Sequence, residues 1–177
     1  MNDILVQGAR PLFFLDYLAT GVMDEAVVTE VVSGIAQACR ENRCALLGGE
    51  TAQMPDFYDD HEYDLAGFIV GLVPQARVLD GSAVREGDVL IGLPSSGLHT
   101  NGYTLARRIV FDHMGLSVDD EFPEVGGTVA EQLLAVHRSY LDVVTPLVDD
   151  GLVHALAHIT GGGIPGNLPR VLPEGLG

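Results

Sequence analysis

A long amphipathic segment between two short apolar runs is the feature that most restricts how this chain can fold. From Asp24 to Asn42, apolar residues recur at the spacing of a helix with one buried face. Acidic residues stand at its start, where the positive end of a helix favours them. The apolar runs within residues 10–17 and 44–47 predict buried strands. The pattern therefore predicts a strand, a helix and a second strand in succession.

Later segments continue this alternation. Leu65–Val73 predicts a fully buried strand, and Val89–Leu93 predicts the start of another. Helical spacing returns over Leu105–Met114 and over Val129–Val148, where Pro146 is expected to kink or end the helix. These elements predict an α/β (α+β) fold with mixed sheets and packed helices, whereas the order of the strands is not predicted.

The length of the chain suits one domain or two small ones. It has 177 residues, of which 47% are hydrophobic, so it can bury a sizeable core. Residues 74–88 mix Pro, Gly, Asp and Arg, a composition typical of a connection between units. We therefore expect one domain over residues 1–80 and a second over residues 81–177.

The charge of the chain excludes nucleic acid as a partner. The formal net charge is -16 at pH 7, and all 9 basic residues are arginines. Binding to a phosphate backbone depends on clustered Lys and Arg. The only adjacent basic pair is Arg107-Arg108, inside a predicted helix, and we interpret it as a solvated face.

Three features predict a cytoplasmic protein that does not bind membranes. The longest apolar stretch, Leu65–Val73, is too short to cross a bilayer, and the N-terminus lacks a basic region followed by an apolar core. The two cysteines, Cys39 and Cys44, match no metal-binding spacing and have no accompanying pair of histidines. We therefore expect a reduced intracellular chain without zinc.

A glycine pair followed by a carboxylate is the first candidate for a functional loop. The predicted strand before Gly48 ends in Gly48-Gly49-Glu50. Glycines let the backbone approach a ligand closely, and Glu50 can then reach that ligand. The alternative is a tight turn whose glutamate faces water. The same two interpretations are open for Asp3.

Two further loops are suited to bind anions. Ser95–Tyr103 is rich in hydroxyl groups and glycine and precedes a predicted helix. Within it, His99 can donate a proton or bind phosphate, although a lone loop histidine is more often structural. His158–Gly163 exposes the amides of three glycines, and its alternative is a flexible surface turn. With Asp3 and Glu50, these loops indicate chemistry of phosphate and Mg²⁺ without a Walker loop.

Four segments in order resemble the aminoimidazole ribonucleotide synthetases, also called phosphoribosylformylglycinamidine cyclo-ligases. They are Asn2–Ala9, Gly48–Ala52, Ser95–Tyr103 and His158–Gly163. The resemblance implies an incomplete two-domain architecture of that family, with an N-terminal part used for ATP binding and dimerisation. It also implies ATP-dependent cyclisation of formylglycinamidine ribonucleotide in purine biosynthesis. In that reaction the formyl oxygen is phosphorylated, a nitrogen attacks the activated carbon, and phosphate leaves.

The resemblance also implies roles for individual residues. Asp3 and Glu50 would bind Mg²⁺, while His99 and Asn101 would assist the chemistry. The groups that would bind ATP or phosphate are Asp3, Ser95, Ser96, Gly97, Thr160, Gly161, Gly162 and Gly163. The family forms homodimers through strands of the N-terminal domain, so we expect a homodimer with ATP and Mg²⁺ as cofactors.

The family's upstream glycine-rich phosphate segment and most of its second domain are absent from this sequence, so we interpret the chain as a fragment. One alternative is a non-catalytic truncated chain that only folds or dimerises. The other is a related ATP-dependent enzyme, such as selenophosphate synthetase or thiamine-monophosphate kinase.

Overall fold

The computed structural model describes residues 1–176 and divides them into two compact units. The first unit contains Met1–Asp80 and Leu141–Val153, and the second contains residues 81–140 and 154–176. None of the helices in the described residues combines the length and the apolar character that a bilayer crossing requires.

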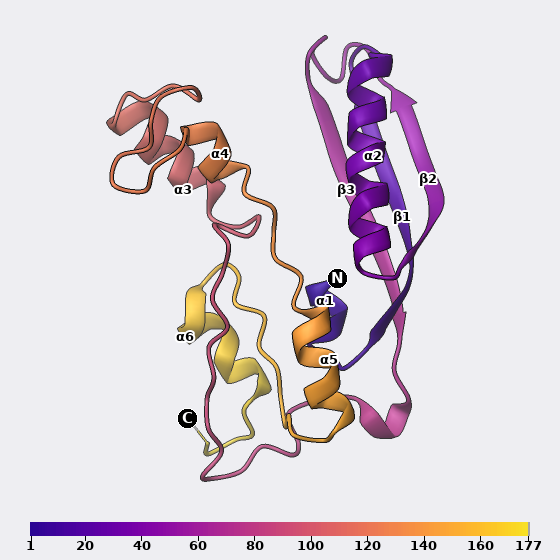
Figure 1. The fold of residues 1–177 in the computed structure, drawn as a ribbon, viewed down its shortest axis with the longest axis vertical. Helices are drawn as coiled ribbons and strands as arrows, with labels where there is room; N and C mark the ends of the chain where they lie inside the picture. The colour runs from indigo at the N-terminus through magenta and orange to yellow at the C-terminus, as the bar shows by residue number, and fades with distance from the viewer. Residues whose placement is uncertain (177) are drawn as a thin grey trace. The chain divides into compact units, whose positions relative to one another are not determined.

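The first unit is built on a 3-stranded mixed sheet with the order β2-β1-β3 (Figure 1). The central strand, β1 (Arg10–Thr20), is parallel to β2 (Ala45–Gln53) and antiparallel to β3 (Tyr63–Leu72). The helix α2 (Glu25–Glu41) connects β1 to β2 and lies along one face of the sheet (Figure 1). A crossover of this kind is what two parallel strands require. The predicted mixed α/β class is confirmed.

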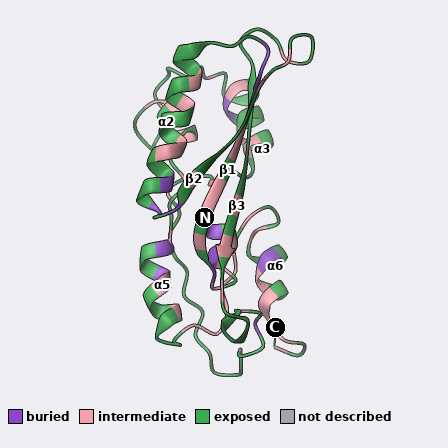
Figure 2. Cartoon of the chain, turned by 90° about the vertical axis from the view of Figure 1, so that its right-hand side faces the viewer, coloured by how far each residue is buried: buried purple, intermediate pink, exposed green. Residues whose placement is uncertain are grey.

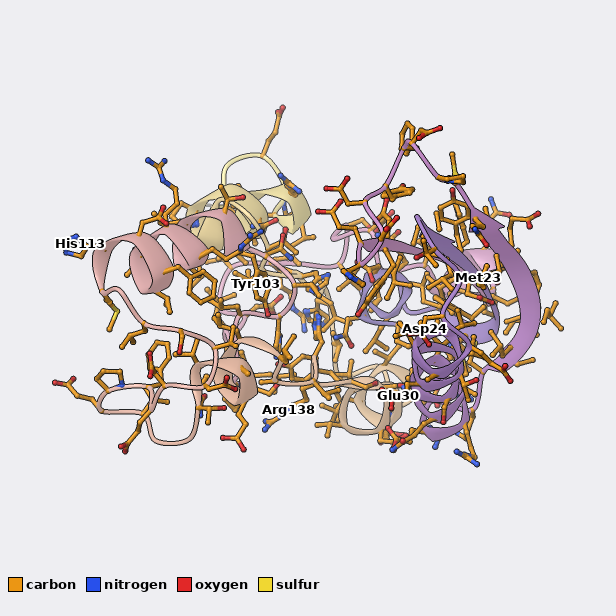
Figure 3. The ribbon with its side chains drawn as sticks, turned by 90° about the horizontal axis from the view of Figure 1, so that it is seen from above. Met23, Asp24, Glu30, Tyr103, His113 and Arg138 are labelled. Carbon is orange, nitrogen blue, oxygen red and sulfur yellow. The ribbon has the colours of Figure 1, made fainter. Side chains whose placement is uncertain are left out.

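Local chemistry explains where α2 begins. The side chain of Asp24 accepts hydrogen bonds from the amides of Ala26 (2.9 Å) and Val27 (3.4 Å), which have no partner within the helix. Figure 3 shows Met23 and Asp24 at this end of α2. Glu25 adds negative charge to the first turn. The predicted helix over residues 24–42 is confirmed to within one residue at each end.

Three short elements complete the first unit. They are α1 (Asn2–Leu5), η1 (Gln75–Arg77) and α5 (Leu141–Asp149). The helix α1 contacts β1, β3 and α5. Two arginines, Arg10 and Arg77, form ion pairs with Asp149, the last residue of α5.

The prediction of one helix over residues 129–148 is wrong. The structure has α4 (Val129–Leu133) in the second unit and α5 in the first, with residues 134–140 non-helical between them. Pro146 lies inside α5, and the helix continues to Asp149. The apolar spacing continues across both helices, but periodicity does not show that the two halves bury their side chains in different units.

The expectation of buried strands is also wrong for β2 and β3. Figure 2 shows β2 and β3 largely in the colour of exposed residues. Leu18 and Ala19 of the central strand are 1% and 0% exposed, whereas Leu47 of β2 and Phe68 of β3 are 63% and 66% exposed. The side chains of a strand project from the two faces of the sheet, so those of the outer strands β2 and β3 are exposed where no other element lies over the face. Their apolar side chains therefore form a surface suited to contact with protein.

The second unit is built from short helices. They are α3 (Tyr103–Arg107), η2 (Arg108–His113, a π-helical segment), α4, α6 (Gly163–Asn167) and η3 (Leu168–Val171). Tyr103 and His113 mark the two ends of the continuous stretch formed by α3 and η2 (Figure 3). At the start of α4, Thr128 and Glu131 form a reciprocal capping box.

The predicted strand at Val89–Leu93 does not form. In the described part of the second unit, β pairing is limited to an isolated bridge between Glu121 and Thr128. The side chains of Val89, Leu90 and Ile91 are 82%, 72% and 81% exposed. An apolar run favours extended backbone, but a strand also needs a neighbour for its N–H and C=O groups. No strand among residues 1–176 supplies that neighbour.

Candidate functional site

The Gly48-Gly49 pair lies inside β2, where it permits an irregular strand pairing. Phe14 pairs with Leu46, and Leu15 pairs with Gly48, so Leu47 is an extra residue in β2. Gly48 has a φ of 118°, which a glycine adopts without strain. The prediction that the strand ends in these glycines is therefore wrong, because β2 continues to Gln53 and a glycine pair that usually marks a turn can also form a bulge.

Glu50 lies on the bulged strand, opposite Tyr17, and is exposed. Asp3 lies in α1, and its side chain is 72% exposed. The neighbouring Ile4 reaches Gly71, which pairs with Pro11 near the other end of the sheet. Pro11 and Tyr17 are separated by roughly 20 Å along β1. The structure therefore does not bring Asp3 and Glu50 together within one chain.

Asp3 and Glu50 do not share a metal centre. Among the described residues there is no cluster of three or more His, Cys, Asp or Glu side chains suited to hold a metal ion. A protein site for Mg²⁺ uses one or two carboxylates and completes its shell with water and substrate phosphates. Asp3 and Glu50 do not form such a centre by themselves, and we assign no reaction step to a metal.

In the second unit, the Ser95–Asn101 loop is organised by a contact between Ser96 and His99. The Ser96 amide donates a hydrogen bond to Nε2 of His99 at 2.8 Å, and the Ser96 hydroxyl lies 2.8 Å from the same nitrogen. Because an amide can only donate, Nε2 is the acceptor, and the proton of the neutral ring is on Nδ1. The Ser96 hydroxyl also donates to the carbonyl of Val136 (2.8 Å).

The backbone of this loop is strained. His99 and Thr100 have φ values of 51° and 62°, and neither is a glycine. Left-handed backbone is unusual for non-glycine residues and most of all for a β-branched one, and each such residue costs on the order of 1–3 kcal/mol. Asn101 is exposed and donates from Nδ2 to the His99 carbonyl at 3.2 Å. The loop thus holds His99 and Asn101 in a defined conformation.

A row of three imidazoles connects the two predicted anion-binding loops. The rings of His99 and His137 are stacked, with centroids 4.0 Å apart and planes inclined by 18°. The ring of His137 lies 5.9 Å from that of His158, the first residue of the second loop. The hydroxyl of Thr100 is 3.3 Å from Nδ1 of His137. The loops at residues 95–101 and 158–163 are therefore neighbours in the second unit.

The surroundings of His99 favour its neutral form. Burial lowers the pKa of His99, and electrostatic interaction with Arg138 and His158 lowers it further. At neutral pH the ring therefore keeps Nε2 as the acceptor for Ser96 and presents the proton on Nδ1. A neutral imidazole held in this way can donate a hydrogen bond to an oxygen of a substrate or phosphate.

Acidification is expected to destabilise this loop. The pKa of His99 is lower in the folded than in the unfolded state, so the unfolded state binds the proton more readily. The free energy of unfolding should therefore fall as the pH drops through about 6.5, the ordinary histidine value, and continue to fall until the pH is below the folded pKa. Urea unfolding at pH 7.5 and 5.5 measures the effect.

The matched variant is His99→Asn, because asparagine tolerates left-handed backbone and does not titrate. It should show a smaller loss of stability between the two pH values than the parent chain. His113→Asn removes an exposed imidazole at the end of η2 and should retain the parental loss. An equal loss of stability in the parent chain and both variants would contradict the assignment of the pH dependence to His99.

The glycine loop before α6 is held by one buried side chain. Asn167 is 4% exposed, and its Nδ2 donates to the carbonyls of Thr160 (3.4 Å), Gly161 (3.2 Å) and Gly163 (2.8 Å). The hydroxyl of Thr160 donates to Oδ1 of Asn167 at 3.2 Å. Gly162 has a φ of 93°, which suits glycine. The hydrogen bonds of Asn167 with the Thr160 hydroxyl and with three carbonyls thus fix the backbone of the glycine loop.

Several of these contacts could not be recognised from the pattern. His137 falls inside the stretch predicted as a continuous helix, and only tertiary stacking places it beside His99. The side chains of Arg138 and Tyr140 likewise reach the start of the Ser95–Asn101 loop, because both donate to the carbonyl of Pro94, the residue before it. Asn167 stands four residues after Gly163, and this closeness to the glycine motif was the one available signal.

Comparison with protein families gives matches over both parts of the chain. Residues 1–73 match the N-terminal domain of AIR synthase related proteins, and residues 85–177 match the C-terminal domain of the same proteins.

Individual relatives agree with these matches. Proteins of Citrifermentans bemidjiense and Sorangium cellulosum, each named phosphoribosylformylglycinamidine cyclo-ligase, are both 55% identical to this chain, over 175 and 179 residues. The matches cover 99% and 100% of this chain but 50% and 51% of the relatives, so the chain spans about half their length.

A solved structure shares the fold. A crystal structure of the hydrogenase maturation protein HypE in complex with ATP superimposes with a TM-score of 0.63 and 21% identity, covering 96% of this chain and 46% of that one. At this identity the likeness concerns the fold alone.

Proposed function

This chain belongs to the AIR synthase related protein family, and we propose from this membership that it takes part in the ATP-dependent cyclisation of formylglycinamidine ribonucleotide to aminoimidazole ribonucleotide. The observation that carries the proposal is the 55% identity over 99% of the chain to a protein named phosphoribosylformylglycinamidine cyclo-ligase. ATP supplies the phosphoryl group that converts the formyl oxygen into a leaving group, and ADP and phosphate are released.

The two neighbouring loops of the second unit are the proposed contact with substrate and phosphate. Ser95, Ser96 and Gly97 form one side, and Thr160 to Gly163 form the other. The geometry that supports this assignment is the row of histidines joining the loops, with centroid distances of 4.0 and 5.9 Å. Arg138, whose amide donates to the Ser96 hydroxyl at 3.2 Å, adds positive charge beside a chain that is otherwise strongly acidic.

His99 and Asn101 are the proposed catalytic residues. The neutral His99 ring has its proton on Nδ1, so it can donate to an oxygen on which negative charge develops. Asn101 has an exposed amide that can orient the same group. The left-handed backbone at residues 99 and 100 holds both side chains in place before the substrate arrives.

We assign Asp3 and Glu50 to separate contacts with Mg²⁺ or with Mg²⁺-bound phosphates. Both carboxylates are exposed, and they lie near opposite ends of the sheet. Each would therefore share its ion with water, with ATP phosphates or with groups from a second chain, as is usual for Mg²⁺.

The working form proposed for the protein is a cytoplasmic homodimer. Residues 1–80 would form the ATP-binding and dimerising part, and residues 81–177 would belong to the C-terminal part. Exposed apolar side chains on the outer strands support association: Leu47, Phe68 and Leu72 are 63%, 66% and 65% exposed. The same surface favours, as second candidate, a chain that associates with another polypeptide without catalysing the reaction alone.

Calorimetric titration of the 177-residue chain with a non-hydrolysable ATP analogue tests the proposal, with and without Mg²⁺ and formylglycinamidine ribonucleotide. Saturable binding that depends on Mg²⁺ is expected, followed by turnover in an assay for aminoimidazole ribonucleotide. If a folded sample shows no binding, the result favours the second candidate, a chain that associates with another polypeptide without catalysing the reaction alone.

A pair of variants gives this titration a matched control. Glu50→Gln keeps the size of the side chain but removes the charge, and it should weaken the Mg²⁺-dependent affinity on the order of tenfold. Glu30→Gln changes another exposed carboxylate, on α2 (Figure 3), and should leave the affinity unchanged. Equal affinities for the parent chain and both variants would contradict the role of Glu50.

A further inference from the structure

The end of α2 brings the two cysteines of the chain together. The amide of Cys44 donates to the carbonyl of Cys39 at 2.8 Å, and the amide of Arg43 donates to the carbonyl of Arg40 at 3.1 Å. Arg43 has a left-handed φ of 52°. These are the two hydrogen bonds and the left-handed residue of a Schellman motif. In this motif the first residue beyond the left-handed one packs against the last turn of the helix, and here both positions are cysteine.

The backbone distance between these residues meets the requirement for a disulfide. A Cα atom lies about 2.4 Å from its own carbonyl oxygen and about 1.5 Å from its own amide nitrogen. The 2.8 Å hydrogen bond therefore holds the two Cα atoms no more than about 6.7 Å apart. Disulfides occur at Cα separations up to about 6.8 Å. Both cysteines are free thiols, 3% and 7% exposed.

The two thiols lie in different electrostatic surroundings. Burial raises the pKa of both Cys39 and Cys44. Electrostatic repulsion by Cys44 raises the pKa of Cys39 further, whereas interaction with Cys39 partly offsets the rise at Cys44, which favours Cys44 as the thiol that ionises first. The charged groups that act on the pair are the Asp16 carboxylate, which raises the pKa of Cys39, and the N-terminal ammonium, which lowers both.

We propose that Cys39 and Cys44 are a thiol modification site, at which a peroxide converts the two thiols into a reversible intrachain disulfide. The Cys44 thiolate attacks one oxygen of hydrogen peroxide, the O–O bond breaks, and a sulfenic acid forms with release of hydroxide. The sulfur of Cys39 then attacks the sulfur of Cys44, the S–O bond breaks, and the thiol proton leaves with the oxygen as water. Two thiols and one peroxide thus give one disulfide and two waters, and the peroxide receives two electrons.

The disulfide would fasten the last turn of α2 to the residue just before β2. It closes a short loop, so it should raise the unfolding temperature of the chain by about 5 °C. The reaction should be slow at neutral pH, because buried thiols with raised pKa values are mostly protonated. The rate should be about tenfold higher at pH 8 than at pH 7, because the fraction of thiolate rises by that factor.

The test is treatment of the folded 177-residue chain with hydrogen peroxide, followed by mass spectrometry. We expect a mass lower by about 2 Da, a peptide pair linked through residues 39 and 44, and full reversal by dithiothreitol. Cys39→Ser should instead leave Cys44 as a sulfenic or sulfinic acid. Links between chains, or stepwise oxygen addition without a link in the parent chain, would overturn the proposal.

Two substitutions at Arg43 test whether the helix end causes the reaction. Arg43→Gly keeps the left-handed backbone and should form the disulfide at least as fast as the parent chain. Arg43→Val disfavours that backbone and should reduce the rate severalfold. Both variants lose the exposed ion pair with Asp142, so that loss cannot account for a difference between them. Equal rates in the two variants would show that the helix-end geometry does not direct the reaction.

Discussion

Replacing Gly49 with alanine is expected to lower the free energy of unfolding of the first unit by about 3 kcal/mol. A Cβ atom at this position would lie 1.8 Å from the carbonyl oxygen of Asp16 and 2.6 Å from its carbonyl carbon. Both atoms belong to the backbone of β1, so they cannot move aside as the end of a side chain would. The strands must separate locally, which breaks hydrogen bonds of the β1–β2 pairing. Urea unfolding followed by far-UV circular dichroism measures the loss.

Gly34→Ala is the matched control for this substitution. Gly34 lies inside α2, and apart from its chain neighbours and the helix's own backbone no heavy atom lies within 4 Å of the added Cβ. Alanine in the interior of a helix is favoured over glycine by about 0.5–1 kcal/mol, so this variant should be more stable than the parent chain. The two glycine substitutions should thus have opposite signs. An unchanged midpoint for Gly49→Ala would mean that β1 and β2 are farther apart in solution.

Replacing Asn167 with alanine should have the largest effect in the second unit. The side chain donates to three carbonyls of the glycine loop and is 4% exposed, so its removal leaves buried acceptors without a donor. Such a loss costs about 2–3 kcal/mol, and the loop should become mobile. Unfolding measurements give the energetic effect, and hydrogen exchange of the amides at residues 160–163 reports the mobility of the loop.

Asn167→Asp separates the hydrogen bonds from the space that the side chain fills. It keeps the size and an acceptor for Thr160 but removes the Nδ2 donor and places a carboxylate against the three carbonyls. It should be at least as destabilising as Asn167→Ala. Gln132→Ala removes one exposed hydrogen bond to the Gly126 carbonyl in the same unit and should cost less than about 1 kcal/mol. Similar costs for all three variants would contradict the role of Asn167.

Local sequence predicted the first unit well. The helix after Asp24 formed where its capping residue and apolar spacing place it, and the apolar runs on both sides form β1 and β2. Both signals act over a few residues and do not depend on the rest of the fold. The burial of those strands was not predicted correctly, because exposure depends on which elements lie over each face of the sheet. Leu47 is apolar in a strand and is nevertheless 63% exposed.

The candidate site was likewise predicted only in part from the sequence. The chemistry of the Ser95–Asn101 and His158–Gly163 loops is visible in the sequence, since hydroxyls, glycines and a histidine stand together. The location of Asp3 and Glu50 near opposite ends of one sheet is not visible, because it follows from the strand register. A one-dimensional motif gives the type of ligand that a residue can bind, and pairing between distant strands decides which ligands share a site.

By itself, the sequence determined the mixed α/β class, the helix α2 and the order of the family motifs, since each depends on residues close together in the chain. Only the tertiary structure decided that Gly49 lets β1 and β2 approach closely, that Asn167 fixes the glycine loop, and that His137 lies between the two predicted anion-binding loops. The roles of Gly49 and His137 depend on contacts between segments far apart in the sequence. The role of Asn167 depends on how the glycine loop folds back onto the helix that follows it, which no local pattern encodes. Physically, propensities and caps act within a few residues, whereas burial and register are set by packing across the whole unit.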